Sequence, residues 1–173
     1  NIYFGKEVAK GGFVDKKAMN ASARALMDDM GITLDPAAYV CDLGIAYQQI
    51  VEIAKAVAAN SKILIMDEPT ANLDYGNMIL VMDCIRMLAE KGLCIVFTTH
   101  MPDQAFMCQA KTAMLFRNDP LVFGPCDRVI TKENLYKAYQ ADIDILEVLD
   151  PRGNPIRVCA PGFTRRREES MQS

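Results

Sequence analysis

Two short apolar segments, joined by a helical pattern, constrain the fold more than any other feature of the sequence. Residues 62–67 and 93–98 each contain an unbroken apolar run, and apolar residues that do not alternate with polar ones predict strands buried on both faces. Between them, residues 77–91 carry apolar residues at helical spacing and end at Gly92. Strand, helix and strand in this order predict a βαβ unit with parallel neighbouring strands. We therefore expect an α/β fold.

Two helices are predicted before this unit. Residues 15–30 show a helical pattern that Asp15 can cap and Gly31 can stop, and residues 46–59 show a second one. An apolar stripe runs along the first helix, and we interpret it as core rather than as a binding surface. The stripe consists of Met19, Ala23, Leu26, Met27 and Met30.

The remainder of the chain predicts shorter elements. Residues 112–116 and 121–123 are typical of a β-hairpin, and Thr131 begins another helix. Two late strands, 144–149 and 155–160, flank a turn that contains Pro and Gly. The length of 173 residues favours a single domain.

Composition argues against several functions. The net charge of −3 disfavours a nucleic-acid groove, and the basic run Arg165–Arg167 is followed at once by two glutamates, as in a solvated tail. The six cysteines form no C-x-x-C pair, so reduced thiols are expected rather than a zinc site or a disulfide framework. No apolar run approaches the ~20 residues that a membrane helix requires.

Two acids and the single histidine follow the predicted parallel strands. Asp67 and Glu68 end the first strand, and His100 comes just after the second, so the three side chains are expected to meet at the carboxyl edge of the sheet. One carboxylate can hold Mg²⁺ together with water and substrate phosphates, and the other can act on an attacking water. Acid pairs also begin turns, and a lone histidine is commonly structural. A metallohydrolase is a further reading, but one histidine and two acids underfill such a site.

The surrounding motifs resemble those of a known family. The stretch "ILIMDEPTANLD" (63–74), followed by "TTH" (98–100), resembles the Walker B, D-loop and switch-histidine series of ABC-transporter ATPases. The preceding "DLGIAYQQIVEIAKAVAANSK" (42–62) resembles the signature segment and its helix. Because these motifs occur in the family's order and spacing, the chain is identified as similar to this family over roughly residues 1–160.

The resemblance implies an incomplete P-loop NTPase domain of ABC type, with three layers, a parallel βαβ core and an α-helical subdomain. Residues 1–60 would be the helical signature subdomain, 61–160 the carboxyl-terminal part of the nucleotide-binding core, and 161–173 a tail. No G-x-x-x-x-G-K-[ST] segment occurs in the sequence, and "NIYFGKE" resembles a segment about halfway through such a domain. Strand 93–98 should then have a bare apolar edge, with either a substitute neighbour or a visible defect, and the isolated chain should be poorly soluble or oligomeric.

The resemblance also assigns ATP and Mg²⁺ as cofactors and gives roles to single residues. Asp67 would bind Mg²⁺ through water, Glu68 would act on the hydrolytic water, His100 would contact the γ-phosphate, and Asp74 would lie at a dimer seam. The signature loop, which grips the nucleotide of the opposite subunit, would include Gly44, Ile45 and Ala46. Gly44 stands where the family has a serine, the next two residues replace glycines, and Tyr47 replaces a glutamine, so this loop is expected to bind weakly.

Two functions remain open from the sequence. The chain is either part of an ATP-hydrolysing subunit of an importer, with a second ATPase subunit and a transmembrane permease as partners, or a non-catalytic module that supplies a signature face to another ATPase. Either would lie in the cytoplasm, peripheral to the inner face of the cell membrane. Residues 1–70 resemble sugar importers and residues 71–160 resemble iron-chelate and cobalamin importers, so the transported substrate stays open.

Overall fold

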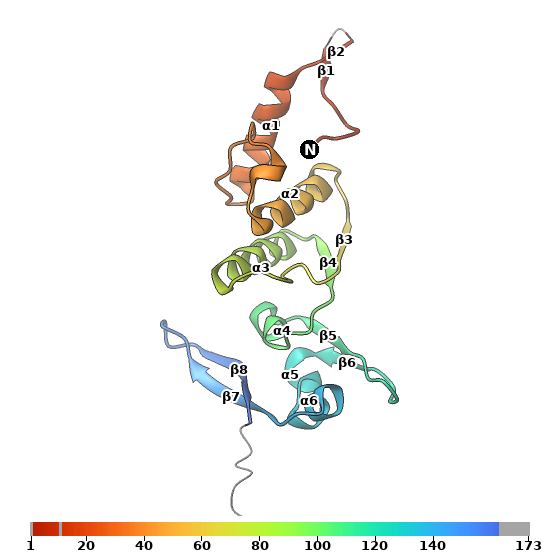
Figure 1. Ribbon diagram of the computed structural model, residues 1–173, viewed down its shortest axis with the longest axis vertical. Coiled ribbons are helices and arrows are strands. Elements are labelled where there is room, and N and C mark those ends of the chain that lie inside the picture. The colour runs from red at the N-terminus through yellow and green to blue at the C-terminus, as the bar shows by residue number, and fades with distance from the viewer. Residues whose placement is uncertain (1, 11, 163–173) are drawn as a thin grey trace, which may run out of the picture. The chain divides into compact units, whose positions relative to one another are not determined.

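The computed structural model describes residues 2–10 and 12–162 (Figure 1). The chain forms two compact units, one ending at His100 and the other beginning at Met101. This boundary differs from the division at residue 60 expected for the two subdomains, which stays a prediction. The basic run Arg165–Arg167 and most of the predicted tail lie outside the described residues. No helix in the described ranges is long and apolar enough to cross a membrane.

The first unit begins with a small antiparallel pair and a helix. Strands β1 (Ala9–Lys10) and β2 (Phe13–Val14) precede α1 (Lys16–Asp29). As predicted, Asp15 caps α1 by accepting a hydrogen bond from the backbone amide of Ala18 at 2.9 Å. The methionine stripe of α1 lies in the core rather than on a binding surface, since Met27 and Met30 are buried.

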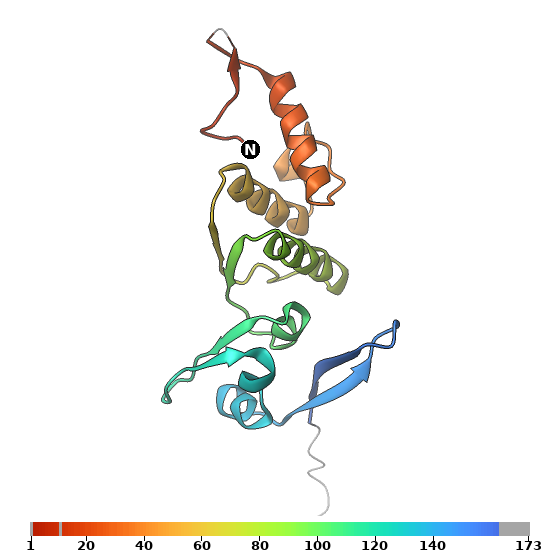
Figure 2. The ribbon, with the colours of Figure 1, turned by 180° about the vertical axis from the view of Figure 1, so that it is seen from behind.

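The predicted βαβ unit is present. Helix α2 (Ile45–Ala58) follows the short 3₁₀ segment Val40–Asp42 and leads into β3 (Ile63–Met66). Helix α3 (Tyr75–Glu90) then connects β3 to β4 (Cys94–Phe97), and the two strands are parallel neighbours. Figures 1 and 2 show α2 and α3 side by side next to these strands.

The expectation that both strands are buried on both faces is wrong. Along β3 and β4, exposed and half-buried residues alternate, and the side chains of Ile65 and Val96 are 74% and 52% exposed. Helices α2 and α3 cover one face of the pair, and no other described element of the first unit covers the opposite face. Apolar residues on both faces are typical of strands that are covered by a layer on each side. The described residues provide only one of these layers.

The sheet also ends after two strands. Among the described residues, β3 and β4 pair only with each other, so β4 has no substitute neighbour on its other edge and the predicted defect of the sheet is present. The amides of Cys94 and Thr98 donate to the carbonyls of Lys62 and Met66. Because hydrogen bonds alternate along a parallel pair, the peptide groups of Ile63 and Ile65 must point away from β4, toward the open edge.

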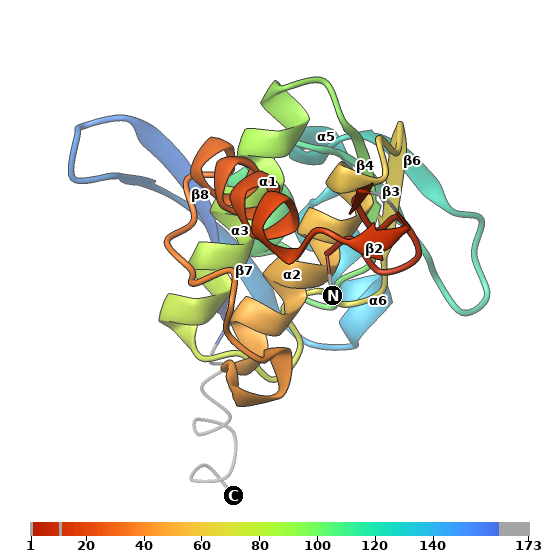
Figure 3. The same ribbon diagram turned by 90° about the horizontal axis from the view of Figure 1, so that it is seen from above.

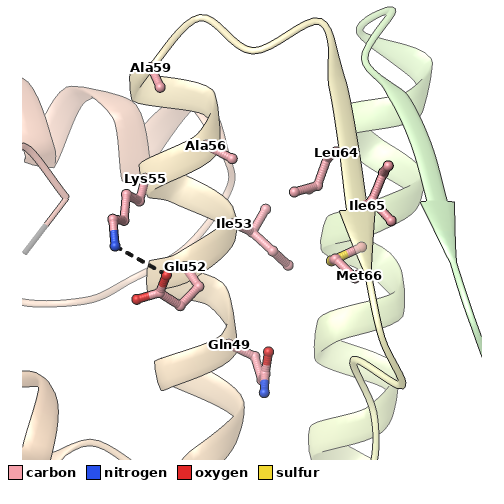
Figure 4. Close-up of a pocket in the computed structure, with 9 residues that line it drawn as sticks. All are labelled: Gln49, Glu52, Ile53, Lys55, Ala56, Ala59, Leu64, Ile65 and Met66. Carbon is pink, nitrogen blue, oxygen red and sulfur yellow. Dashed lines mark hydrogen bonds and ion pairs between the residues drawn. The ribbon is translucent and has the colours of Figure 1, made fainter.

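A groove lies between α2 and this open edge of β3. It has a volume of about 380 Å³ and combines an apolar floor with a polar rim, at which Lys55 and Glu52 form an ion pair of 3.4 Å (Figure 4). In the same view Leu64 points toward α2 and Ile65 points away from it. None of the predicted site residues lines the groove. The lining residues are Gln49, Glu52, Ile53, Lys55, Ala56, Ala59, Leu64, Ile65 and Met66.

The second unit contains two antiparallel hairpins and three short helices. The predicted hairpin is formed by β5 (Lys111–Met114) and β6 (Val122–Pro125), and the predicted late strands by β7 (Ile143–Leu149) and β8 (Pro155–Pro161). The β7–β8 pair forms a long two-stranded ribbon (Figure 3). The helices are α4 (Asp103–Cys108), α5 (Cys126–Val129) and α6 (Lys132–Tyr139).

The core of this second unit lies where the short helices meet the hairpins. Leu135 and Val129 are almost fully buried there, and Met114 and Cys126 pack in the same cluster. As predicted, Thr131 caps α6 by accepting from the amide of Asn134 at 3.2 Å.

No disulfide links the cysteines of the described residues, and their reduced state stays a prediction. Burial raises the pKa of the Cys84 thiol, on α3, to about 11. A thiol with so high a pKa carries almost no thiolate near neutral pH and behaves as a small apolar side chain. Cys84 is therefore a core residue of α3 and not a reactive group.

Candidate nucleotide site

The predicted site residues meet at the carboxyl ends of two strands. Asp67 and Glu68 directly follow β3, and Thr98 and His100 follow β4. The register pairs Met66 with Phe97, so both strands end at the same level of the sheet. The parallel pairing alone thus brings two carboxylates and an imidazole together from distant parts of the sequence.

The contacts among these side chains are direct. Nδ1 of His100 lies 3.3 Å from Oε1 of Glu68. The hydroxyl of Thr98 lies 2.5 Å from Oδ1 of Asp67, and the backbone amide of Glu68 donates to the same hydroxyl at 3.0 Å. Thr98 was not among the predicted site residues, although it belongs to the "TTH" segment that the sequence singles out.

Glu68 adopts an unusual backbone conformation. Its φ is 43°, in the left-handed region, which costs a residue with a Cβ atom about 1–2 kcal/mol. Left-handed residues other than glycine cluster at functional sites, where surrounding contacts hold them. Here the next peptide groups form a turn, with the amide of Ala71 donating to the carbonyl of Glu68 at 2.9 Å. The turn directs the Glu68 carboxylate toward His100.

The donor set fits a magnesium ion shared with phosphate groups better than a metal held by protein alone. Among residues 2–10 and 12–162, no group of three or more His, Cys, Asp or Glu side chains could hold a metal by itself. Mg²⁺ needs only one or two carboxylates when water and substrate phosphates complete its shell. The Asp67 and Glu68 carboxylates are exposed hard oxygen ligands, so they suit an ion that arrives with a nucleotide.

The residues of the predicted signature loop lie at the start of α2. Gly44 is the N-cap residue of this helix, and no side chain caps it. The side chain of Ala46 is 1% exposed whereas that of Ile45 is exposed. Ala46 could therefore meet a ligand only through its backbone amide, one of the amides that the start of a helix leaves without a partner in the helix.

Asp74, expected at a dimer seam, caps α3. Its Oδ1 accepts a hydrogen bond from the amide of Asn77 at 2.8 Å, and its Oδ2 accepts from the side-chain amide of Asn77, also at 2.8 Å. The carboxylate is exposed. Asp74 thus has a structural role within the chain, and its place at a subunit seam stays a prediction.

Solved structures are similar to this chain in fold. The chain is similar to an ABC transporter described as of metal-chelate type, in an inward-facing conformation, with a TM-score of 0.77 and 24% identity over 94% of this chain and 64% of that one. The cbiO1 protein of Clostridium perfringens, part of the ABC transporter complex cbiONQ, gives a TM-score of 0.50 and 25% identity over 63% and 43% of the two chains. The predicted fold class, an incomplete ABC-type P-loop NTPase domain, is confirmed.

Sequence relatives point to the same group of proteins. A ribose import ATP-binding protein of Rubrobacter xylanophilus is 44% identical over 100 residues, 58% of this chain and 20% of the relative. One from Streptomyces avermitilis is 39% identical over 149 residues, 84% of this chain and 29% of the relative. The galactose/methyl galactoside import ATP-binding protein of Escherichia coli is 35% identical over 135 residues, 75% and 27% of the two chains. The chain is homologous to ABC importer ATP-binding proteins.

The chain matches only a small part of each of these relatives. The chain spans less than a third of the length of these curated relatives. No protein-family model matches it. The relatives named here are sugar import proteins, and the resemblance of residues 71–160 to iron-chelate and cobalamin importers stays a prediction.

Proposed function

We propose that this chain is the carboxyl-terminal part of an ATP-hydrolysing subunit that energises an ABC importer. The observation that carries the proposal is the contact of Glu68 with His100 at 3.3 Å, next to Asp67, at the ends of the parallel strands. Homology to importer ATP-binding proteins supports the same role. ATP would be hydrolysed between two such subunits, and a transmembrane permease would be the second partner.

Each residue of the cluster has a chemical task in this proposal. Asp67 would hold Mg²⁺ through water, and the ion would draw negative charge from the phosphates of ATP. Glu68 would orient the attacking water and accept its proton, which is a task for a carboxylate placed beside the reacting phosphate. His100, whose ring is oriented by its Nδ1 contact with Glu68, would hydrogen-bond the terminal phosphate.

The signature loop and the partners belong to the same proposal. Backbone amides at the start of α2, from Ile45 and Ala46, would meet the phosphates of a nucleotide bound to the second subunit, where the helix dipole favours negative charge. Asp74 would lie at the seam between the subunits. The assembly would lie at the cytoplasmic face of the membrane, and its cargo would be a sugar or else an iron chelate or cobalamin.

Turnover in a complete subunit tests the catalytic assignment. In a fusion, the chain replaces the matching segment of the Streptomyces avermitilis relative, and phosphate release from ATP is measured. Glu68→Gln should lower turnover at least about 100-fold, because it removes the proton acceptor while keeping the shape. Glu90→Gln, at the exposed end of α3, is the matched control and should leave turnover unchanged. Equal turnover of Glu68→Gln and the unmodified fusion would remove Glu68 from catalysis.

A second function is favoured by one observation, the lack of a glycine-rich phosphate loop in the sequence. The chain would then be a non-catalytic module that lends the start of α2 to a complete ATPase. Titration of the purified chain with Mg-ATP separates the two. Binding at micromolar concentration by the chain alone contradicts the module, whereas binding by the fusion and not by the chain is expected for a part of an active subunit.

A further inference from the structure

The hydroxyl of Thr98 joins the metal-binding candidate Asp67 to the catalytic candidate Glu68. It lies 2.5 Å from Oδ1 of Asp67 and accepts a hydrogen bond from the amide of Glu68 at 3.0 Å. The backbone of Thr98 is itself fixed, because its amide donates to the carbonyl of Met66 at 3.0 Å. One side chain directly after β4 therefore contacts both residues that follow β3.

The direction of these hydrogen bonds follows from their donors. A backbone amide can only donate, so the Thr98 hydroxyl must accept from Glu68. The single hydroxyl proton then points to the carboxylate of Asp67. No hydrogen bond of a described residue engages Oδ2 of Asp67. The hydroxyl thus fixes one oxygen of this carboxylate and leaves the other available to a ligand.

The second contact bears on the conformation of Glu68. A left-handed residue with a Cβ persists only where its surroundings hold it, and the amide of Glu68 is held by Thr98. The same conformation directs the Glu68 carboxylate to His100. Without the hydroxyl, the peptide of Glu68 would lose its partner and its side chain would leave this direction.

We propose that Thr98 is a positioning residue whose hydroxyl sets the Asp67 carboxylate and the Glu68 peptide in their relative places. The contact itself stands on the geometry of this chain, and its effect on catalysis rests on the proposed function. Thr98 would act through Asp67 and Glu68 rather than on a reacting group.

Hydrogen exchange of the chain tests the contact. In Thr98→Val the amide of Glu68 should exchange about tenfold faster, as expected for the loss of one hydrogen bond, while Thr98→Ser stays within about twofold of the unmodified chain. The amide of residue 98, bonded to Met66, reports whether the strand pair is intact. Thr112→Val, which removes a half-buried threonine hydroxyl bonded to the carbonyl of Ala110, is the control and should leave the Glu68 amide unchanged.

Two results would contradict the proposed hydrogen bond between the Thr98 hydroxyl and the Glu68 amide. One is a Glu68 amide that exchanges equally in Thr98→Val and the unmodified chain. The other is a Thr98→Ser chain with an intact strand pair and an unprotected Glu68 amide. If Thr98→Val loosens the strand pair as well, Thr98→Ser decides the question.

The magnesium dependence of the fusion tests the consequence. Thr98→Val should raise the Mg²⁺ concentration for half-maximal turnover about tenfold, and Thr98→Ser should restore it to within about twofold. An unchanged requirement in Thr98→Val overturns the positioning role. A fusion that turns over no ATP even without substitution refutes the proposed function, and hydrogen exchange then still decides the Thr98 contact.

Discussion

Asp74 has a structural role as a helix cap and a second, proposed role at a subunit seam. Both of its carboxylate oxygens are engaged by Asn77 at the start of α3, so the side chain has a local reason to be an acid. A place at a subunit seam would be added to this role, because the carboxylate is exposed. The two roles can be separated, since capping needs an oxygen acceptor and not a charge.

Replacement of Asp74 should therefore change stability in a graded way. Asp74→Ala should lower the free energy of unfolding by about 1 kcal/mol, whereas Asp74→Asn keeps an acceptor for the Asn77 amide and should stay within a few tenths. Urea denaturation of the chain measures both. If Asp74→Ala is as stable as the unmodified chain, the cap contributes nothing and only the seam role would remain for this acid.

At the scale of elements, the start of α2 joins local stability to the proposed nucleotide contact. Gly44 has φ −61° and ψ 154°, a conformation that any residue adopts, and a Cβ at this position would meet nothing within 4 Å. The glycine is thus not required by the backbone. A serine fits here, with a hydroxyl able to accept from an amide of the first turn.

The free energy of unfolding of Gly44→Ser should be at least that of the unmodified chain and clearly higher than that of Gly44→Ala. Serine and alanine should differ by about 1 kcal/mol, because both add a Cβ but only serine can cap the helix. Urea denaturation again measures the difference. Equal stability of the serine and alanine variants would show that the helix start gains nothing from a side-chain acceptor.

The same scale shows what the sequence could and could not predict. Periodicity predicted α1, α2, α3 and the pairing of β3 with β4, and strand order alone placed His100 beside Glu68. Helix α3 begins at Tyr75 rather than at residue 77, because Asp74 caps it. The sequence alone indicates Asp74 only as part of the D-loop motif. Helices α4 and α5 have six and four residues, too few to show a period.

Two other features depend on spatial neighbours rather than on local pattern. Burial of β3 and β4 on both faces needs a second covering layer, which apolar composition implies but the described residues do not provide. The contact of Thr98 with Asp67 and Glu68 depends on the register of two strands, and a threonine in a strand end has no pattern of its own.

At the scale of the whole molecule, the β3–β4 pair combines two properties that favour association. Its outer face presents Ile65 and Val96 to solvent, and the peptide groups of Ile63 and Ile65 point to an open edge. Natural sheets protect such edges with charged side chains or covering elements. In the part of the chain that the structure describes, neither protects this edge of β3, so the isolated chain is expected to pair with other chains through it.

A lysine at the open edge should therefore weaken self-association. Ile65→Lys places a charge on a residue that is 74% exposed, so folding should be little affected, whereas an approaching strand would have to bury that charge. Tyr39→Lys, at a residue that is 76% exposed and distant in sequence from the strands, is the matched control. Sedimentation measures the concentration at which each variant associates. This concentration should be about tenfold higher for Ile65→Lys than for the unmodified chain, and unchanged for Tyr39→Lys. Two results would show that chains do not associate through the open strand edge. One is an unmodified chain that stays monomeric at ~100 µM, well above the micromolar affinities of many specific contacts. The other is an equal effect of both lysines.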